Sequence, residues 1–312
     1  MLKLAFKALL SMLKNRQRMS GRTWMTEFYA RITRLIFEIG MNVPVEKFRK
    51  MLNAVTVSNS AIKKVNFKWT EISGISSLTV KPLENTNKES LIVYFHGGAY
   101  IVGSPIGYKP FLAQIAVNTG MKIIAPEYRL SPEYPFPAAQ DDCLAVLKSV
   151  RKDNPNSTII AMGDSAGGAL AISTALSGAK IDALMLISPW VEPTADSGSM
   201  LSNEVNDIFT LEFLSRSYAS HIQKSNLLDA RVNFLNADLS KLPRCYIQYA
   251  GGELLHDQIV GFIDRATKQG VAIKVDVYEK QFHVFQALAP ILSDTKDAIN
   301  KLVGFVTHNT KD

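Results

Sequence analysis

The chain of 312 residues contains very little cysteine, with Cys143 and Cys245 as its only two. They lie far apart, in segments patterned like a helix interior and a strand interior, so the sequence argues against a disulfide framework and predicts two buried free thiols. The two cysteines and five histidines have no spacing typical of metal ligands. We therefore expect no metal and no cofactor.

Long hydrophobic runs are also missing, and no window approaches the ~20 apolar residues that a membrane span needs. The opening stretch "MLKLAFKALLSMLKNRQR" is broken at Lys7 and is followed by no small-residue cleavage site, so it does not match a signal peptide. Its apolar residues share one helical face. This pattern predicts an amphipathic helix that either covers the protein or makes weak contact with a membrane surface. We expect a cytoplasmic protein.

Acidic residues are scarce near the N-terminus: residues 1–68 hold 14 Lys and Arg against 3 Asp and Glu, although the whole chain carries a net charge of +7. A basic segment can contact nucleic acid or a membrane. We favour the solvated face of an added helical segment and expect no nucleic-acid partner. The oligomeric state stays open, a homodimer included. With 47% hydrophobic and 20% charged residues, the composition is that of an ordinary globular enzyme.

The order of periodic segments predicts an α/β fold with a mostly parallel sheet covered by helices on both faces. Helical patterns fill residues 1–55, and two strands around Ser73-Gly74 then form a hairpin. Strands and helices alternate from Ser90 onward, ending in a helix from about Val284 to His308. We expect N-terminal cap helices at 1–55, core segments at 56–190 and 242–312, and a cap insertion at 191–241. The insertion has no strand pattern and one helical stretch near Leu211–His221.

The stretch "STIIAMGDSAGGALAIS" places a serine, Ser165, at a sharp corner between a buried strand and a helix. Gly163 and Gly167 leave the corner free of bulky side chains, which matches G-x-S-x-G in its required strand–turn–helix setting. The corner exposes the hydroxyl and places the N-terminus of a helix behind it, where negative charge is stabilised. Ser165 is therefore the candidate nucleophile.

A second strand ends in "YFHGGAY", Tyr94–Tyr100. Its successive glycines allow the backbone N–H groups to point inward. We expect those of Gly97 and Gly98, with that of Ala166, to form an oxyanion hole. His96 is expected to brace this loop by hydrogen bonding rather than to act as a base.

A serine nucleophile needs a base and an acid, which follow it in the order acid, then histidine, in this class of motif. His283, in the loop after the strand "IKVDVYEK", is the best-placed base among the histidines. The acid should follow the strand "RCYIQYA", where Glu253 and Asp257 are both candidates and Glu253 is preferred.

With "HGGAY", "YRLSPEYPFPAAQDD" and "GDSAGG" in this order, the sequence resembles the hormone-sensitive-lipase-like, bacterial family IV esterases of the α/β-hydrolase superfamily. The resemblance implies Ser165, His283 and an acid at the Glu253 position, a cap over the site, and a structural role beneath it for Arg129, Glu133 and Asp142. Two departures stand out. Ala99 replaces the glycine that usually ends the HGGG motif of the oxyanion loop, and Glu253-Leu254-Leu255 stands where the family has Asp-Pro-Leu.

The function favoured by these residues is hydrolysis of short- to medium-chain carboxylic esters through an acyl-enzyme. An amidase, peptidase or acyltransferase could use the same groups, because pocket shape selects the leaving group. A ligand receptor on a disabled hydrolase scaffold is the alternative of another class, and the presence of His283 argues against it. A set of apolar residues either lines the acyl pocket or forms the interior of the cap: Tyr100, Trp190, Ile208, Phe209, Leu211, Phe213 and Leu214.

Overall fold

An eight-stranded sheet runs through the molecule in the order β1-β2-β4-β3-β5-β6-β7-β8. The computed structural model describes residues 21–55, 59–84, 86–193, 198–222, 227–288 and 290–307. The strands are β1 Val65–Ile72, β2 Ile75–Pro82, β3 Asn87–Phe95, β4 Met121–Pro126, β5 Thr158–Asp164, β6 Ala183–Ile187, β7 Cys245–Ala250 and β8 Ile273–Tyr278.

The sheet confirms the predicted mostly parallel architecture. In the run β4-β3-β5-β6-β7-β8 each strand is parallel to the next, and the antiparallel pairs are β1 with β2 and β2 with β4. The expected hairpin joins β1 to β2. Its two loop residues, Ser73 and Gly74, have φ of 53° and 79°, the left-handed conformations of a tight hairpin whose twist suits the strands.

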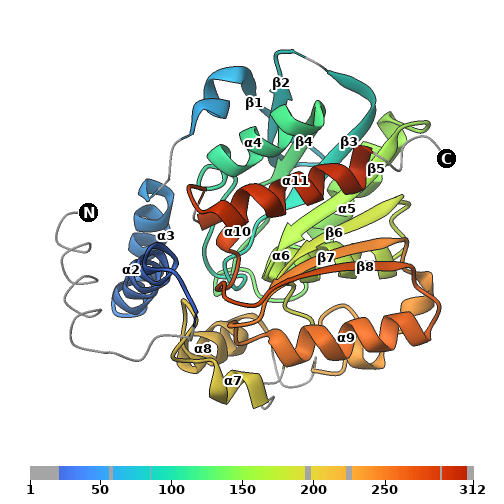
Figure 1. Cartoon of the computed structure of the whole chain (residues 1–312). Helices are drawn as coiled ribbons and strands as arrows, with labels where there is room; N and C mark the ends of the chain where they lie inside the picture. Colours follow the sequence, from blue (N-terminus) through green and yellow to red (C-terminus); the bar gives the residue numbers. More distant parts are fainter. Residues whose placement is uncertain are drawn as a thin grey trace.

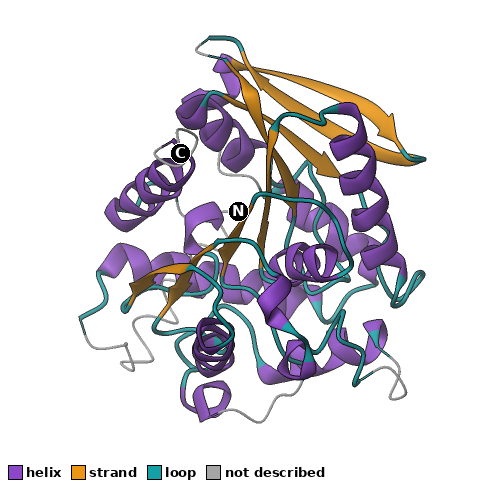
Figure 2. Ribbon diagram, turned by 90° about the vertical axis from the view of Figure 1, so that its right-hand side faces the viewer, coloured by secondary structure: helices purple, strands orange, loops and turns teal. Residues whose placement is uncertain are grey.

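Helices cover both faces of the sheet, and Figure 2 shows the twisted strands between them. One face carries α4 Lys109–Thr119 and α11 Ser293–Thr307, and the other carries α5 Ala138–Asp153, α6 Ala166–Leu176 and α9 His256–Lys268. In Figure 1, α11 and α9 lie on opposite sides of β7 and β8. Strands β5, β6 and β7 are almost entirely buried, as expected for strands covered on both faces.

A second group of helices lies together at one side of the sheet (Figure 1). We call these the accessory helices: α2 Trp24–Gly40, α3 Val45–Ala54, α7 Gly198–Ser202 and α8 Leu211–His221. Aromatic contacts join them, since the ring of Phe37 meets Phe213 at 5.0 Å and Phe48 at 5.7 Å. The described N-terminal helices and the insertion thus pack on each other, while their division into cap domains stays a prediction. The amphipathic helix expected in the first 18 residues lies outside the described residues.

Two further observations bear on the sequence predictions. The prediction of one long last helix from about Val284 was wrong at its N-terminal end. Residues Phe285–Leu288 form a separate short helix, α10, and α11 begins only after Pro290. The helix is interrupted there because proline has no N–H to continue it. Both cysteines are buried and free, as predicted. Short 3₁₀ turns complete the described elements: η1 Ser60–Lys64, η3 Phe234–Asn236 and η4 Leu239–Lys241. No described helix is long and apolar enough to cross a bilayer.

Candidate active site

Ser165 lies at the corner between β5 and α6, with φ 53° and ψ −122°. This left-handed backbone is costly for a residue with a side chain, by ~1–3 kcal/mol, and persists only where the surroundings fix it. Hydrogen bonds fix it here: the Ser165 N–H donates to the carbonyl of Ile187, and the Ser165 carbonyl accepts from Trp190 N–H at 3.0 Å and Ala169 N–H at 3.1 Å. These hydrogen bonds therefore hold the backbone of Ser165, and with it the hydroxyl, in a fixed position.

The two glycines that flank the corner are required by close backbone contacts. A Cβ on Gly167 would lie 2.0 Å from the carbonyl oxygen of Phe95, and one on Gly163 would lie 2.3 Å from that of Gly167. Neither position has room for a side chain. Bulky neighbours would therefore clash at this corner, as the sequence predicts.

The loop after β3 differs from the prediction in one respect. The N–H of Gly97 donates to Oδ1 of Asp164 at 2.9 Å, so it is already bonded and faces a carboxylate. By contrast, no hydrogen bond to a described residue occupies the N–H groups of Gly98, Ala99 or Ala166. Gly98 has φ 124°, and a Cβ there would meet the carbonyl oxygen of Val102 at 2.1 Å. The prediction of Gly97 as an oxyanion donor is therefore corrected, and Ala99 takes its place among the free donors.

Asp164, the residue before the serine, was not singled out from the sequence. It is 1% exposed and accepts hydrogen bonds from the hydroxyl groups of Tyr94 and Tyr108 as well as from Gly97. Burial raises its pKa, while these hydrogen bonds lower it. The carboxylate thus joins the serine corner to the glycine loop. A charged residue at the end of a fully apolar strand was the signal in the sequence.

His283 and Glu253 meet at the end of the sheet. The Nδ1 atom of His283 lies 3.1 Å from Oε2 of Glu253, and both side chains are almost fully buried. Burial lowers the pKa of His283, but the hydrogen bond and negative charge of Glu253 raise it above its ordinary value on balance. Burial raises the pKa of Glu253, and the hydrogen bond from His283 opposes that rise. The pair has the geometry of an imidazole oriented by a carboxylate.

The other nitrogen of the imidazole, Nε2, is buried and has no partner among the described residues. Asp257, the alternative acid, lies elsewhere: its carboxylate accepts from Ser199 N–H at 2.7 Å and contacts His256. It forms no hydrogen bond or ion pair with His283, and its side chain is 46% exposed. Of the two candidate acids, the structure brings only Glu253 to the histidine.

Ser165 and His283 open into one cavity of about 490 Å³. Gly97, Gly98 and Ala99 line it as well, and most of its wall is apolar. The accessory helices and the loop before α8 contribute a large part of this wall: Phe28, Tyr29, Ile32, Ile36, Phe37, Leu52, Ile208, Phe209, Phe213 and Leu214. The predicted candidates Phe209 and Phe213 thus border the same space as the serine and the histidine.

Three of the predicted pocket residues, Tyr100, Trp190 and Leu211, do not line this cavity. Tyr100 stacks on the imidazole of His221 at 3.9 Å between ring centroids, and Trp190 lies 6.0 Å from Tyr100 and 5.6 Å from Tyr218. Tyr100 thus packs on His221, and Trp190 packs on Tyr100 and Tyr218, so both residues belong to the packed interior rather than to the cavity wall.

The expected bracing residues have definite partners. Arg129 forms a bidentate ion pair with Asp142, with N–O distances of 2.7 and 2.9 Å. Glu133 pairs instead with Arg49 of α3 at 2.8 Å, so it links the core to an accessory helix. His96 braces the loop as predicted: its Nδ1 lies 2.8 Å from the carbonyl of Gly97, and burial lowers its pKa to about 4.

The sheet order and the serine corner define an α/β hydrolase, and comparison with known proteins agrees. A family model described as alpha/beta hydrolase fold matches residues 92–287. This is more than half of the chain, which therefore belongs to that family.

Individual relatives narrow the class. An acetyl-hydrolase of Streptomyces hygroscopicus is 28% identical over 222 residues, covering 69% of this chain and 74% of the relative. An esterase of Acinetobacter venetianus is 27% identical over 252 residues, covering 78% and 82%. A crystal structure of an esterase from the bacterial hormone-sensitive lipase family has a TM-score of 0.80 at 25% identity, covering 89% of this chain and 97% of that one. The chain is a carboxylic ester hydrolase of the hormone-sensitive-lipase-like type.

Proposed function

We propose that this esterase works through an acyl-enzyme, with Ser165 as nucleophile, His283 as general base and Glu253 as the acid that orients it. The observation that carries the proposal is the 3.1 Å contact of Glu253 with Nδ1 of His283, whose Nε2 is buried and unpaired among the described residues. His283 lines the same cavity as Ser165. Nε2 is then the atom that takes the serine proton as Oγ attacks the ester carbonyl. The imidazolium returns that proton to the leaving alcohol, and water repeats the cycle.

The oxyanion of each tetrahedral intermediate is held by backbone N–H groups. The available donors are those of Gly98, Ala99 and Ala166, since the N–H of Gly97 is bonded to Asp164. Ala166 is the first residue of α6, so the positive end of that helix adds to the stabilisation. Each such donor typically contributes about 3 kcal/mol to the transition state.

The substrates are carboxylic esters with short or medium acyl chains. A cavity of about 490 Å³ with an aromatic and aliphatic wall fits a small apolar ligand, within the ordinary range for such pockets. Side chains of α2 and of the segment before α8 form part of the wall of the space that holds Ser165, and this apolar wall limits the access of water to the acyl-enzyme. A cytoplasmic location remains part of this proposal.

Covalent labelling tests the nucleophile. A fluorophosphonate should label the wild-type protein at one site, and Ser165→Ala should abolish both the label and ester hydrolysis. Ser173→Ala, on the same helix and equally buried, is the matched control and should keep both. A label that survives in Ser165→Ala would refute the assignment.

A series of p-nitrophenyl esters from acetate to palmitate tests the substrate class. We expect the highest kcat/KM for esters with short or medium acyl chains and a steep fall for longer ones, because the wall of the cavity limits the length of acyl chain that fits. Highest rates above about ten carbons would contradict this part of the proposal and leave the assignment of Ser165 intact.

A further inference from the structure

Asp207 lies in the segment between α7 and α8 and is 2% exposed. Its carboxylate contacts the backbone on both sides of the site. Oδ1 accepts the N–H of His283 at 3.0 Å and that of Ile208 at 2.8 Å, and Oδ2 accepts the N–H of Leu254 at 2.8 Å. Leu254 directly follows Glu253. One carboxylate of the accessory segment therefore ties together the loop of the acid and the loop of the base.

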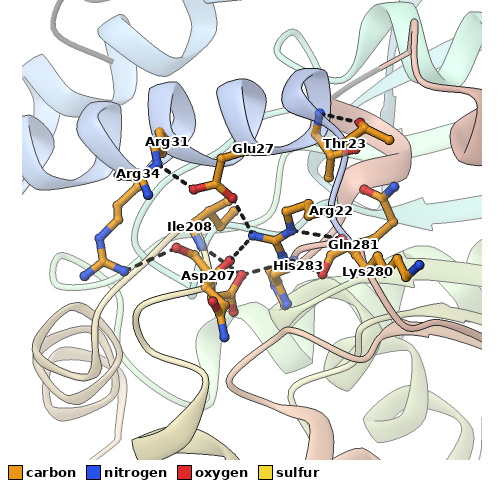
Figure 3. Close-up of polar contacts among 12 residues, drawn as sticks. Arg22, Thr23, Glu27, Arg31, Arg34, Asp207, Ile208, Lys280, Gln281 and His283 are labelled. Atoms are coloured by element: carbon orange, nitrogen blue, oxygen red, sulfur yellow. Dashed lines mark hydrogen bonds and ion pairs between the residues drawn. The ribbon is translucent and has the colours of Figure 1, made fainter. Parts of the chain in front are cut away.

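Arg22, just before α2, binds the loop that leads to His283 and the accessory segment next to Asp207 through their backbone carbonyl groups. Its guanidinium donates to the carbonyls of Lys280 at 2.9 Å, Gln281 at 2.9 Å and Asn206 at 2.8 Å. Figure 3 shows the guanidinium between Glu27 on α2 and the loop that leads to His283, with Asp207 beside it. Burial lowers the pKa of Arg22, and the negative charges of Glu27 and Asp207 oppose that shift. The arginine fixes the backbone on which Asp207 and His283 are mounted.

We propose that Asp207 and Arg22 form a positioning pair of this esterase: together they hold Glu253 and His283 in register, and the Asp207 charge stabilises the imidazolium that forms during catalysis. The inference rests on the proposed role of His283 as the base. Neither residue reaches the cavity atoms that react, since Asp207 acts through the backbone of its neighbours and Arg22 through carbonyls. A merely structural carboxylate would bind one loop, whereas this one joins both loops of the acid–base pair.

The charges that face His283 set the expected sign. They are the carboxylates of Glu253, Asp207 and Asp164, and all three raise the pKa of the imidazole against the opposing effect of burial. The ring of Phe209 lies edge-on to the imidazole, with 4.7 Å between ring centroids, and carries no charge. Loss of the Asp207 charge therefore makes the imidazolium less stable. The acid limb of the pH–kcat/KM profile should then move to lower pH.

The experiment compares Asp207→Asn with Asp182→Asn. Asp182 also accepts a backbone N–H, that of Ile159 at 2.7 Å, and forms an ion pair with Arg151, but it lies at the opposite end of β5. In Asp207→Asn, one backbone N–H must face the amide NH₂, so the loops shift. We expect kcat to fall about 10- to 100-fold with KM changed by less than about threefold, as for a small misplacement of reacting groups. The acid limb should move down as well, and Asp182→Asn should change only thermal stability.

Equal behaviour of the two variants, with an unchanged acid limb, would overturn the inference. Arg22→Lys covers the case in which Asp207→Asn does not fold: it keeps the charge but cannot bridge three carbonyls, and we expect a three- to tenfold loss of kcat. An unchanged kcat in that variant would equally overturn the pair. Fluorophosphonate labelling of the wild type separates the two levels. If the wild type is labelled normally but Asp207→Asn and Arg22→Lys keep the wild-type kcat and acid limb, the proposed function stands and this inference is wrong.

Discussion

The sheet core and the accessory helices are held in place by different interactions. The central strands β5 and β6 are buried among aliphatic side chains on both faces, and their register fixes where they end. The accessory segments also share apolar contacts, but they are fastened to the core by guanidinium groups on backbone carbonyls. Arg22 bonds to Lys280 and Gln281, and Arg49 bonds to Ile101 at 2.8 Å and Ser131 at 2.7 Å.

This difference separates two tasks within one site. The core mounts the serine corner and the glycine loop rigidly, because buried strands cannot shift without opening cavities. The accessory helices supply most of the cavity wall and depend on a few polar attachments. Changes in the core should therefore alter chemistry and folding. Changes in accessory attachments that do not contact the loops of Glu253 and His283, such as Arg49, should mainly alter substrate binding.

Among these substitutions, Glu253→Gln in the core should lower the catalytic rate most. The amide keeps the shape but removes the charge that orients and stabilises the imidazolium, so we expect kcat to fall by about 10³-fold or more. Asp257→Asn is the matched control, because its carboxylate contacts Ser199 and His256 instead. Steady-state kinetics on a p-nitrophenyl ester measures both. A large loss in Asp257→Asn with little in Glu253→Gln would reverse the assignment of the acid.

Gly167→Ala should lower the stability of the sheet core. The new Cβ would lie 2.0 Å from one backbone carbonyl oxygen and 2.5 Å from the next, so backbone must move, and we expect about 3 kcal/mol of destabilisation or loss of folded protein. Gly261→Ala, in the middle of α9, meets nothing within 4 Å and should stabilise the protein by about 1 kcal/mol. Denaturant unfolding compares the two. A Gly167→Ala variant as stable as wild type would show that the corner is not rigid.

The same difference explains what could be predicted from the sequence. Strand positions, the serine corner and the histidine follow from local patterns, because period and turn residues are set by neighbours along the chain. Asp207 and Arg22 could not be found in this way. Their partners lie in other segments and are mostly backbone groups, which leave no mark in the sequence. The Gly97 donor was misassigned for a similar reason, since its N–H is taken by a side chain 67 residues away.

Arg49→Met tests how the accessory helix α3 is attached to the core. It removes two carbonyl contacts and the pair with Glu133, while Leu52, Asn53 and Val55 nearby line the cavity. We expect KM for an apolar ester to rise about three- to tenfold with kcat within about twofold, and the free energy of unfolding to fall by about 1–2 kcal/mol.

Arg216→Met is the control for that substitution. Arg216 pairs with Glu212 on the exposed surface of α8, with side chains 63% and 59% exposed, and such pairs contribute little. Its KM and stability should stay at wild-type values. Equal effects in the two variants would mean that the carbonyl contacts of Arg49 do not hold the wall of the cavity.

The smallest expected effect is a shift of the acid limb in the pH profile of kcat/KM. This shift depends on both regions, because carboxylates of the core and of the accessory segment both act on His283. Only the neutral imidazole can accept the serine proton, so kcat/KM should be lost as pH falls through the pKa of His283. Burial lowers that pKa, but Glu253, Asp207 and Asp164 raise it above the ordinary value of 6.5. The midpoint of the acid limb is therefore expected above about pH 6.5 in the wild type and lower in Glu253→Gln. A wild-type midpoint well below 6 would mean that burial outweighs the three carboxylates, and that neither region stabilises the imidazolium as the geometry indicates.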